Sequence, residues 1–218
     1  MQYYTLIASL PHLPPHFDVP RPPISRPRLN QRLKELKEDD ARVIKQLSDF
    51  LAWDRQTLDR SEKDVIADYE RISEEIHHPV VMKIVDHRID MRTIVGALRR
   101  RRDGNGPPQG VGRLVRPIQD RWKEPQFGLQ RQFRWIERFE HLMLGGDAVA
   151  AERLLYQDNW DLSCRMASEF RFSFEAVLLY LARWSIVDRW TSRDAEAGIS
   201  RFDQLLEETL GDYAQLEF

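Results

Sequence analysis

Helical periodicity is the feature that most constrains how this chain can fold. From residue 28 onward, apolar residues recur every three or four positions, which places them on one face of a helix. The segment 79–102 has this spacing and is followed by Gly104, which is placed to end the helix. The segment 174–190 is apolar on nearly every side, which is typical of a helix at the centre of a core. Since no segment shows the alternation of a strand, the pattern predicts an all-α protein.

The predicted architecture is a single irregular multi-helix bundle of six to eight helices. Residues 1–27 are expected to form a separate segment, with a packed apolar start and a stiff proline-rich connector. Residues 28–218 are expected to form one helical domain, with a loop at 103–118 that is rich in glycine and proline. For Tyr3 and Tyr4 in the apolar start, a core position is favoured over a docking role.

The charges are unevenly distributed along the sequence. The formal net charge is −2, but residues 99–138 contain eleven Lys or Arg and four Asp or Glu, a local charge of +7. The rest of the chain has a charge of −9. A chain polarised in this way can orient on a charged partner or on another part of itself.

The compartment expected from the sequence is the cytoplasm. The first residues lack the basic start of a signal peptide, and the most apolar later run, 176–182, is far shorter than a bilayer. Cys164 is the only cysteine, which excludes a disulfide within the chain and a cysteine-based metal cluster. We therefore expect a cytoplasmic protein without direct membrane insertion, which can still sit at the inner face of a membrane within a larger assembly.

Motifs for catalysis or cofactor binding are not evident. The glycines of segment 103–118 lack the Lys-Ser/Thr of a phosphate-binding loop and follow a predicted helix, not a strand. Glu74 with His77 and Glu75 with His78 have the Glu-x-x-His spacing of di-iron bundles, but the two pairs overlap at a helix end and cannot face one metal. The expectation is a non-enzymatic protein with no cofactor, no metal site and no small-molecule substrate.

Four consecutive arginines, Arg99, Arg100, Arg101 and Arg102, form the last turn of a predicted helix. Cations at this end oppose the negative end of the helix dipole, which contributes about 0.3–1 kcal/mol each when they are exposed. Four successive positions cover a full turn, so at least one arginine must point away from solvent or toward a partner. We expect an acidic partner for that arginine, inside the fold or across an interface.

Nucleic-acid binding is the alternative that the basic segment leaves open. Three arginines alternate with Phe133, Trp135 and Phe139, and a surface of this composition can stack on bases. These aromatic positions coincide with the apolar stripe of a predicted helix at 129–143, however, so a core role is favoured for them. Nucleic-acid binding is therefore the minority interpretation.

One stretch resembles a known family of rotary ATPase subunits. Residues 89–104, IDMRTIVGALRRRRDG, are similar to a helix of the C-type (or d-type) stalk subunits of V/A-type ATPases. That helix typically reads Asp-x-x-Asn-Ile, followed by Leu-Arg and a basic end closed by glycine. The matching residues are Asp90, Ile94, Leu98 and Arg99. Thr93 departs from the pattern, because it stands where asparagine is usual.

A second resemblance covers most of the chain. The start YYTLIASLP, the segment FSFEAVLLYLARWSIVDRW and the following DAEAGISRFDQLL are similar to a bacterial family of unknown function. Members of that family open with a Tyr-Tyr...Ala-Ser-Leu-Pro signature and are typically encoded among V-type ATPase subunits. The residues that fit its pattern are Phe174, Tyr180, Arg189, Trp190 and Gly198.

These resemblances imply a fold like that of the C-type stalk subunits and a non-catalytic structural or assembly role, such as a central-stalk role, in a V-type ATPase that translocates protons or sodium. The implied partners are subunits of the stalk or of the membrane rotor ring. The three similar modules of the classical C-type family are not found, which indicates a shortened replacement or an accessory factor. Because interactions concentrate in exposed loops on rigid helices, we expect partner contacts around the arginine run. The predicted partner-binding residues are Arg99, Arg100, Arg101, Arg102, Arg113 and Arg116.

Overall fold

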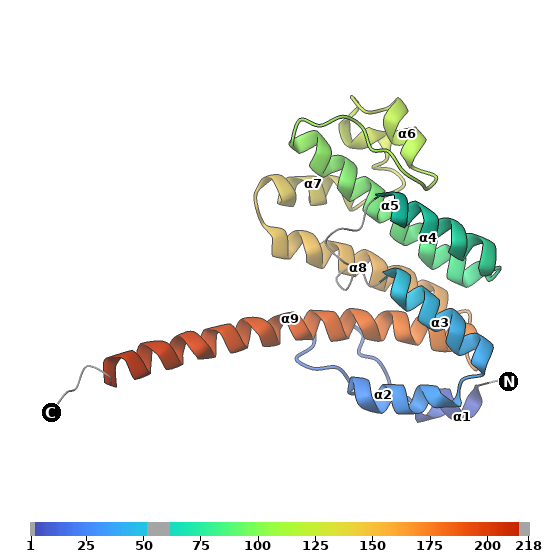
Figure 1. Cartoon of the computed structure of the whole chain (residues 1–218), viewed down its shortest axis with the longest axis vertical. Coiled ribbons are helices and arrows are strands. Elements are labelled where there is room, and N and C mark those ends of the chain that lie inside the picture. The colour runs from blue at the N-terminus through green and yellow to red at the C-terminus, as the bar shows by residue number, and fades with distance from the viewer. Residues whose placement is uncertain (1–2, 52–61, 214–218) are drawn as a thin grey trace. The chain divides into compact units, whose positions relative to one another are not determined.

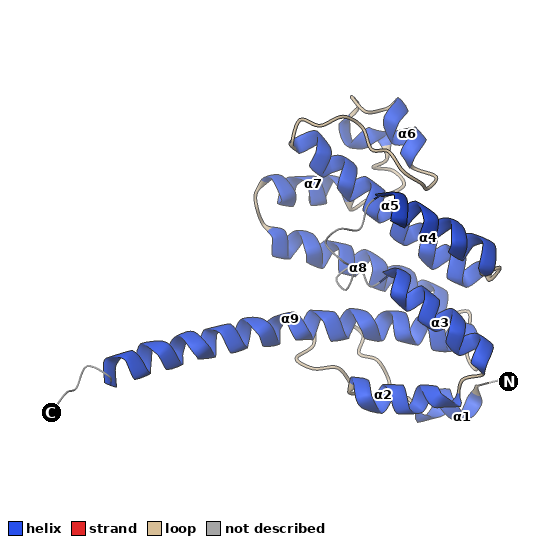
Figure 2. Ribbon diagram, viewed as in Figure 1, coloured by secondary structure: helices blue, strands red, loops and turns tan. Residues whose placement is uncertain are grey.

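The computed structural model describes the backbone of residues 3–51 and 62–213, and the side chains of residues 3–51 and 63–193. Regular structure within these residues is entirely helical (Figure 2). The predicted all-α class is thus confirmed, with nine α-helices in the described residues where six to eight were expected. None of the helices within the described ranges is both long and apolar enough to cross a membrane.

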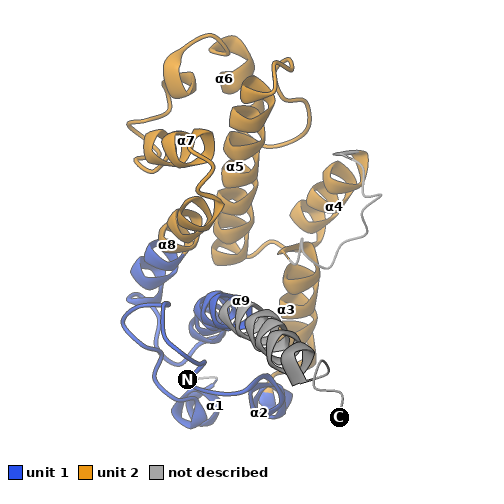
Figure 3. Cartoon of the chain, turned by 90° about the vertical axis from the view of Figure 1, so that its left-hand side faces the viewer, with its two compact units in different colours: residues 1–35, 160–218 blue, residues 36–159 orange. Residues whose placement is uncertain are grey.

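The chain divides into two compact units (Figure 3). Unit 1 consists of residues 1–35 and 160–218, and unit 2 consists of residues 36–159. The N-terminal 27 residues, which we expected as a separate segment, belong to unit 1 together with residues from the C-terminal part of the chain. The helical part from residue 28 onward contributes to both units.

The helices follow one another along the chain as labelled in Figure 1. Those of unit 1 are α1 (Tyr4–Ser9), α2 (Arg26–Arg32), the short 3-10 helix η1 (Leu33–Glu35) and α9 (Phe174–Tyr213). Those of unit 2 are α3 (Glu38–Leu51), α4 (Glu62–Glu75), α5 (Pro79–Arg102), α6 (Val115–Asp120), the 3-10 helix η3 (Pro125–Gly128) and α7 (Ile136–Leu144). Helix α8 (Ala148–Ala167) contains the boundary between the units.

The N-terminal segment is packed into unit 1, in agreement with its apolar start. Tyr3 is 4% exposed and Leu6 is 1% exposed, and the Tyr3 amide donates to the Phe172 carbonyl oxygen at 3.2 Å. Tyr4 differs from the core position that we favoured, because it is 57% exposed and its ring only borders Phe172. The reason is the helical turn of α1, which points neighbouring side chains in different directions.

The proline-rich stretch lies along α9 and is tied to it by side chains of the helix. The Tyr180 hydroxyl donates to the Pro11 carbonyl oxygen at 3.0 Å, and the Trp184 indole donates to the Ile24 carbonyl oxygen at 2.9 Å. Prolines cannot donate backbone hydrogen bonds, so an extended proline-rich stretch depends on outside donors for its carbonyl groups. Burial raises the pKa of Tyr180 to about 12, against the opposing effect of Arg183.

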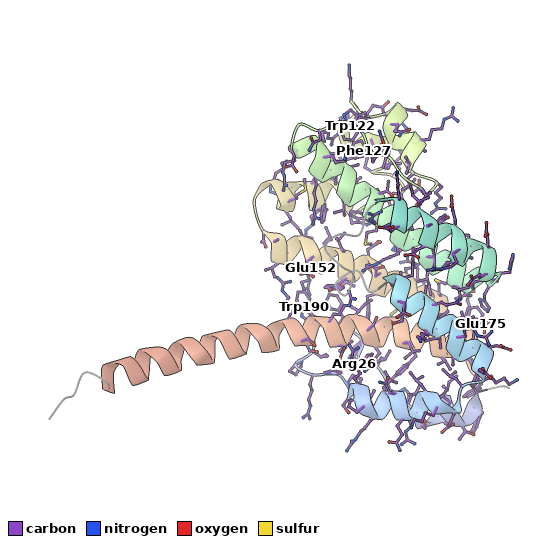
Figure 4. All side chains as sticks on the ribbon, viewed as in Figure 1. Arg26, Trp122, Phe127, Glu152, Glu175 and Trp190 are labelled. Carbon is purple, nitrogen blue, oxygen red and sulfur yellow. The ribbon has the colours of Figure 1, made fainter. Side chains whose placement is uncertain are left out.

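Aromatic and ionic contacts complete the attachment of this stretch within unit 1. Phe17 is fully buried, and its ring meets the Trp190 ring edge-on at 5.4 Å between centroids. Arg26, labelled with Trp190 in Figure 4, forms an ion pair with Asp188 and lies over the ring of Trp184. The expected stiff connector is therefore attached to α9 and anchored by the buried Phe17, while most of its other residues are exposed or half-buried.

Each unit has its own central helix. In unit 1 the first part of α9 is buried on several sides, as its composition predicted, through residues that include Val177, Leu179 and Val187. In unit 2 the central helix is α5, which contacts α3, α6 and α7. The C-terminal half of α5 packs into the main core of unit 2 with side chains from α6, η3 and α7. This packing places the end of α5, where the arginine run lies, over a rigid support.

Two expected boundaries in unit 2 are corrected by the structure. The segment 129–143 was predicted as one helix, but α7 begins only at Ile136, and the residues before it form turns. The loop expected at 103–118 ends earlier, because α6 begins at Val115. Pro117 fits the first turn of α6, where its missing amide hydrogen is not needed.

Candidate interaction surface around the arginine run

The last turn of α5 consists of the four arginines and is closed by glycine, as predicted. Gly104 has a φ of +72°, and its amide donates to the Arg101 carbonyl oxygen at 3.2 Å. The Asn105 amide donates to the Arg100 carbonyl oxygen at 2.8 Å. These bonds satisfy helix carbonyls that would otherwise lack a donor, and they end the helix sharply.

Arg101 is the arginine that turns away from solvent. Its Nη2 lies 2.6 Å from Oε1 of Glu140 on α7, and its Nη1 donates to the Glu124 carbonyl oxygen at 2.9 Å. Its guanidinium carbon lies 4.4 Å from the centre of the Phe127 ring, within the range of a cation–π interaction. The acidic partner that the sequence required for one arginine is thus Glu140, within unit 2 itself.

Below Arg101, the backbone makes a strained turn in η3. Gln126 has a φ of +45° and Phe127 a φ of +56°, values that non-glycine residues rarely adopt. The Phe127 side chain is fully buried and stacks on the Trp122 ring at 5.4 Å between centroids (both labelled in Figure 4). Gln126 Nε2 donates to Oε2 of Glu140 at 2.6 Å, so both oxygens of this carboxylate hold the turn in place together with Arg101.

The other three arginines of the run are exposed. Arg100 Nε donates to the Gly106 carbonyl oxygen at 2.8 Å, and Arg102 Nε lies 2.8 Å from Oδ1 of Asp103. The hydrogen bond from Arg102 lowers the pKa of the Asp103 carboxyl, and the charge of Arg99 lowers it further. Such exposed contacts contribute little to stability and leave the charges available to a partner.

Arg113 forms the second internal ion pair of the basic segment. Its Nη2 and Nε lie 2.5 Å and 2.9 Å from Oδ2 of Asp90, a residue of α5 that is 1% exposed. Burial raises the pKa of Asp90 above its ordinary value of 3.8, although the hydrogen bond and charge of Arg113 oppose this effect. Arg113 therefore ties the loop after α5 back onto the helix.

The raised pKa of Asp90 predicts how stability depends on pH. A carboxyl whose pKa is raised by folding contributes to the free energy of unfolding at low pH. This contribution is fully present below the pKa of the unfolded state, and it is lost as the pH rises through the pKa of the folded state. In an Arg113→Gln variant the opposing charge is removed, so the loss of stability from about pH 4 upward is expected to become steeper. Urea unfolding at a series of pH values measures this pH dependence of the free energy of unfolding, with Arg116→Gln as the control. A variant with the wild-type pH dependence would show that Arg113 does not act on Asp90.

The six predicted arginines belong to the basic segment 99–138 of unit 2, and the exposed basic side chains of this segment are called the basic surface below. Arg116 is exposed on α6, and further basic residues lie between α6 and the middle of α7. The basic side chains of segment 99–138 without a hydrogen bond or ion pair to another described residue are Arg99, Arg116, Arg121, Lys123, Arg131, Arg134 and Arg138. Unlike Arg101 and Arg113, these residues have no carboxylate at ion-pair distance within the described part of the chain.

Three aromatic residues of the same segment are buried in the core of unit 2. Phe133, Trp135 and Phe139 are all buried, and the Trp135 ring meets the Phe139 ring edge-on at 5.8 Å. They belong to the main core of unit 2. The predicted core role of these three residues is therefore confirmed, and they do not offer ring faces to nucleic-acid bases.

The remaining polar motifs of the sequence have structural surroundings. Glu75 Oε2 accepts a hydrogen bond of 2.7 Å from Gln46 Nε2, and His78 is the N-cap residue of α5. Cys164 is a half-buried free thiol in α8. Within the described residues, no three or more His, Cys, Asp or Glu side chains are arranged to hold a metal ion.

Comparison with known proteins identifies no relative of this chain. No family model matches the sequence, no curated protein matches it, and no solved structure matches the fold. Its function has therefore to be inferred from its own residues and their surroundings.

Proposed function

We propose that this chain is a non-catalytic structural or assembly protein that docks through the basic surface of unit 2 onto a V-type ATPase, at its stalk or its membrane rotor ring. The observation that carries the proposal is the division of the arginines into two groups. Arg101 and Arg113 have acidic partners inside the unit, whereas Arg99 and Arg116 are exposed without one in the described part of the chain.

The internally paired arginines make the exposed ones suitable for docking. Arg101 joins α5 to α7 through its ion pair with Glu140, and it also donates a hydrogen bond to the Glu124 carbonyl oxygen just before η3. Arg113 joins the loop after α5 to that helix through its ion pair with Asp90. A partner that meets a surface already held in one conformation loses less conformational entropy on binding. Exposed arginines on such a support can pair with carboxylates of a partner and determine its orientation.

The residues behind the resemblance to the C-type stalk subunits also support a scaffold role. Ile94 and Leu98 are buried in the core of unit 2, and Asp90 is the buried partner of Arg113. Arg99, the remaining matched residue, is exposed at the helix end. The matched stretch thus combines a stable helix with one outward charge, as a docking element requires.

Purification of the tagged chain from its native host tests this proposal. We expect wild-type protein to recover stalk or ring subunits, and an Arg99→Glu/Arg116→Glu variant to recover at least about tenfold less, since like charges at an interface cost several kcal/mol. A Lys34→Glu/Lys45→Glu variant, which changes two exposed lysines elsewhere, is the matched control. If the tagged wild-type chain were purified without any stalk or ring subunits of the ATPase, the proposal would be contradicted.

Nucleic-acid binding remains the second candidate, because residues 99–138 have a local charge of +7 and most of their basic side chains are exposed. It is less favoured, since Phe133, Trp135 and Phe139 are buried and cannot stack on bases. A nucleic-acid-binding module would show an affinity that falls steeply with salt. The absence of a mobility shift with single- or double-stranded probes at low salt would exclude this candidate.

A further inference from the structure

We propose that Asn105–Gly106, in the loop after α5, is a covalent modification site, where the asparagine deamidates through a cyclic succinimide with water as the co-reactant. In an Asn-Gly pair this ring closes with little steric resistance, because glycine has no Cβ beside the attacking nitrogen. Asn30 and Asn159, the other asparagines of the sequence, are followed by glutamine and tryptophan instead. The reaction needs no protein partner, so this inference goes beyond the docking proposed above and does not depend on it.

The reaction closes a ring and then opens it with water. The backbone nitrogen of Gly106 loses its proton to solvent base and attacks Cγ of Asn105. The N–Cγ bond forms, and the Cγ–Nδ2 bond breaks as Nδ2 takes up a proton and leaves as ammonia. Water then adds to either carbonyl carbon of the ring. Addition at Cγ yields aspartate, and addition at the main-chain carbonyl carbon yields isoaspartate.

Both reacting groups are available in the described part of the chain. Asn105 and Gly106 are exposed, and neither the Asn105 side chain nor the Gly106 N–H has a hydrogen-bond partner among the described residues. A Cβ built on Gly106 would meet nothing within 4 Å, so the space beside this residue is open. The Asn105 side chain can therefore turn toward the Gly106 nitrogen without breaking a hydrogen bond, and water can reach the ring.

The same loop contains a comparable pair, Asp103–Gly104, in which both reacting groups are engaged. An Asp-Gly pair closes the same ring with loss of water. However, the Gly104 N–H donates to the Arg101 carbonyl oxygen at 3.2 Å, as part of the end of α5. The Asp103 carboxylate lies 2.8 Å from Arg102 Nε, and the hydrogen bond from Arg102 lowers its pKa. Because a carboxylate anion is a poor electrophile, the structure favours reaction at Asn105 over reaction at Asp103.

Deamidation changes the surroundings of the arginine run. Either product carries a carboxylate at position 105, which lowers the charge of residues 99–138 by one, from +7 to +6. In isoaspartate the main chain runs through Cβ and Cγ and is one carbon longer, so the Gly106 carbonyl oxygen is displaced. This oxygen accepts the 2.8 Å hydrogen bond from Arg100 Nε. We therefore expect the isoaspartate product to release the Arg100 side chain.

Incubation of the folded full-length chain in water enriched in heavy oxygen, at mildly alkaline pH, tests the inference. Opening of the ring adds one oxygen atom from water. Trypsin then releases residues 103–113 as one peptide that contains both pairs, and digestion in ordinary water leaves any later deamidation unlabelled. Fragmentation of this peptide assigns the heavy oxygen to residue 105 or to residue 103.

The expected result is a comparison of the folded chain with the chain unfolded in guanidinium. Asn105 should acquire the label in the folded chain within about threefold of its rate in the unfolded chain, because the fold does not protect it. Asp103 should acquire the label at least about tenfold more slowly in the folded chain than in the unfolded chain, because the fold engages both of its reacting groups.

Gly106→Ala is the matched variant. Its Cβ should slow labelling of Asn105 by at least about tenfold through hindrance of ring closure, whereas its thermal unfolding should match that of the wild type, since this Cβ meets nothing. Protection of Asn105 by more than about tenfold on folding would overturn the inference. Labelling of Gly106→Ala at the wild-type rate would overturn it too. Since the purified chain contains no ATPase, failure here would leave recovery of ATPase subunits by the tagged chain unaffected.

Discussion

Replacement of Arg101 by methionine is expected to lower the free energy of unfolding by about 3 kcal/mol, although the residue lies in a run of arginines that looks like a surface feature. The variant leaves Glu140 half-buried without its cation and removes the hydrogen bond to the Glu124 carbonyl oxygen. It also removes the guanidinium group from the face of Phe127. Because Gln126 and Phe127 have strained φ angles, the turn depends on these contacts to keep its conformation.

The neighbouring arginine provides a matched control for this prediction. Arg99→Met removes the same charge from the same helical turn, but Arg99 is exposed and its loss should change stability by no more than about 0.5 kcal/mol. Urea unfolding followed by tryptophan fluorescence measures both variants. In a double-mutant cycle with Glu140→Gln, we expect a coupling of about 1–3 kcal/mol between Arg101 and Glu140. Equal effects of the two arginine variants would contradict the structural role of Arg101.

The second large effect is expected for Gly112→Ala, with a loss of about 3 kcal/mol. Gly112 has a φ of +110°, which strains any residue with a side chain, and an added Cβ would lie 2.6 Å from Cγ2 of Ile89. Ile89 is buried in α5, and its branched side chain has little rotamer freedom in a helix. The loop would have to move away from α5, and Arg113, the next residue, would move away from Asp90.

Gly106 is the control for this position, because it lies in the same loop and a Cβ there would meet nothing within 4 Å. Gly106→Ala is therefore expected to be neutral or slightly stabilising, through the lower entropy of the unfolded chain. Thermal unfolding of the two variants compares them directly. If Gly112→Ala unfolded at the same temperature as the wild type, this result would contradict the close packing of the loop against α5.

Local patterns in the sequence predicted much of the fold. The recurrence of apolar residues placed α5 correctly, because a helix that buries one face requires this spacing wherever it packs. The glycine end of α5 was also predictable, since a positive φ is needed one residue beyond a helix end of this kind. The same reasoning failed before α7, where Phe133 and Trp135 are buried from turns instead of from a helix.

The candidate surface was only partly predictable. Helix geometry alone required that one of four consecutive arginines turn inward, but not which one. The choice of Arg101 depends on Glu140, a residue 39 positions away on another helix. Arg113, predicted as a partner-binding residue, has an internal partner in Asp90, whereas Arg131, Arg134 and Arg138, which were not predicted, are exposed.

The sequence by itself determined the helical class and the positions of central helices such as α5, because helix formation depends on the spacing of apolar residues and on the residues at helix ends. It also determined that a basic segment exists. Only the tertiary structure decided which arginines are structural and which are exposed, because ion pairs such as that of Arg101 with Glu140 join residues that are distant in sequence. Burial of a charge requires a partner in space, and a linear pattern does not contain that information.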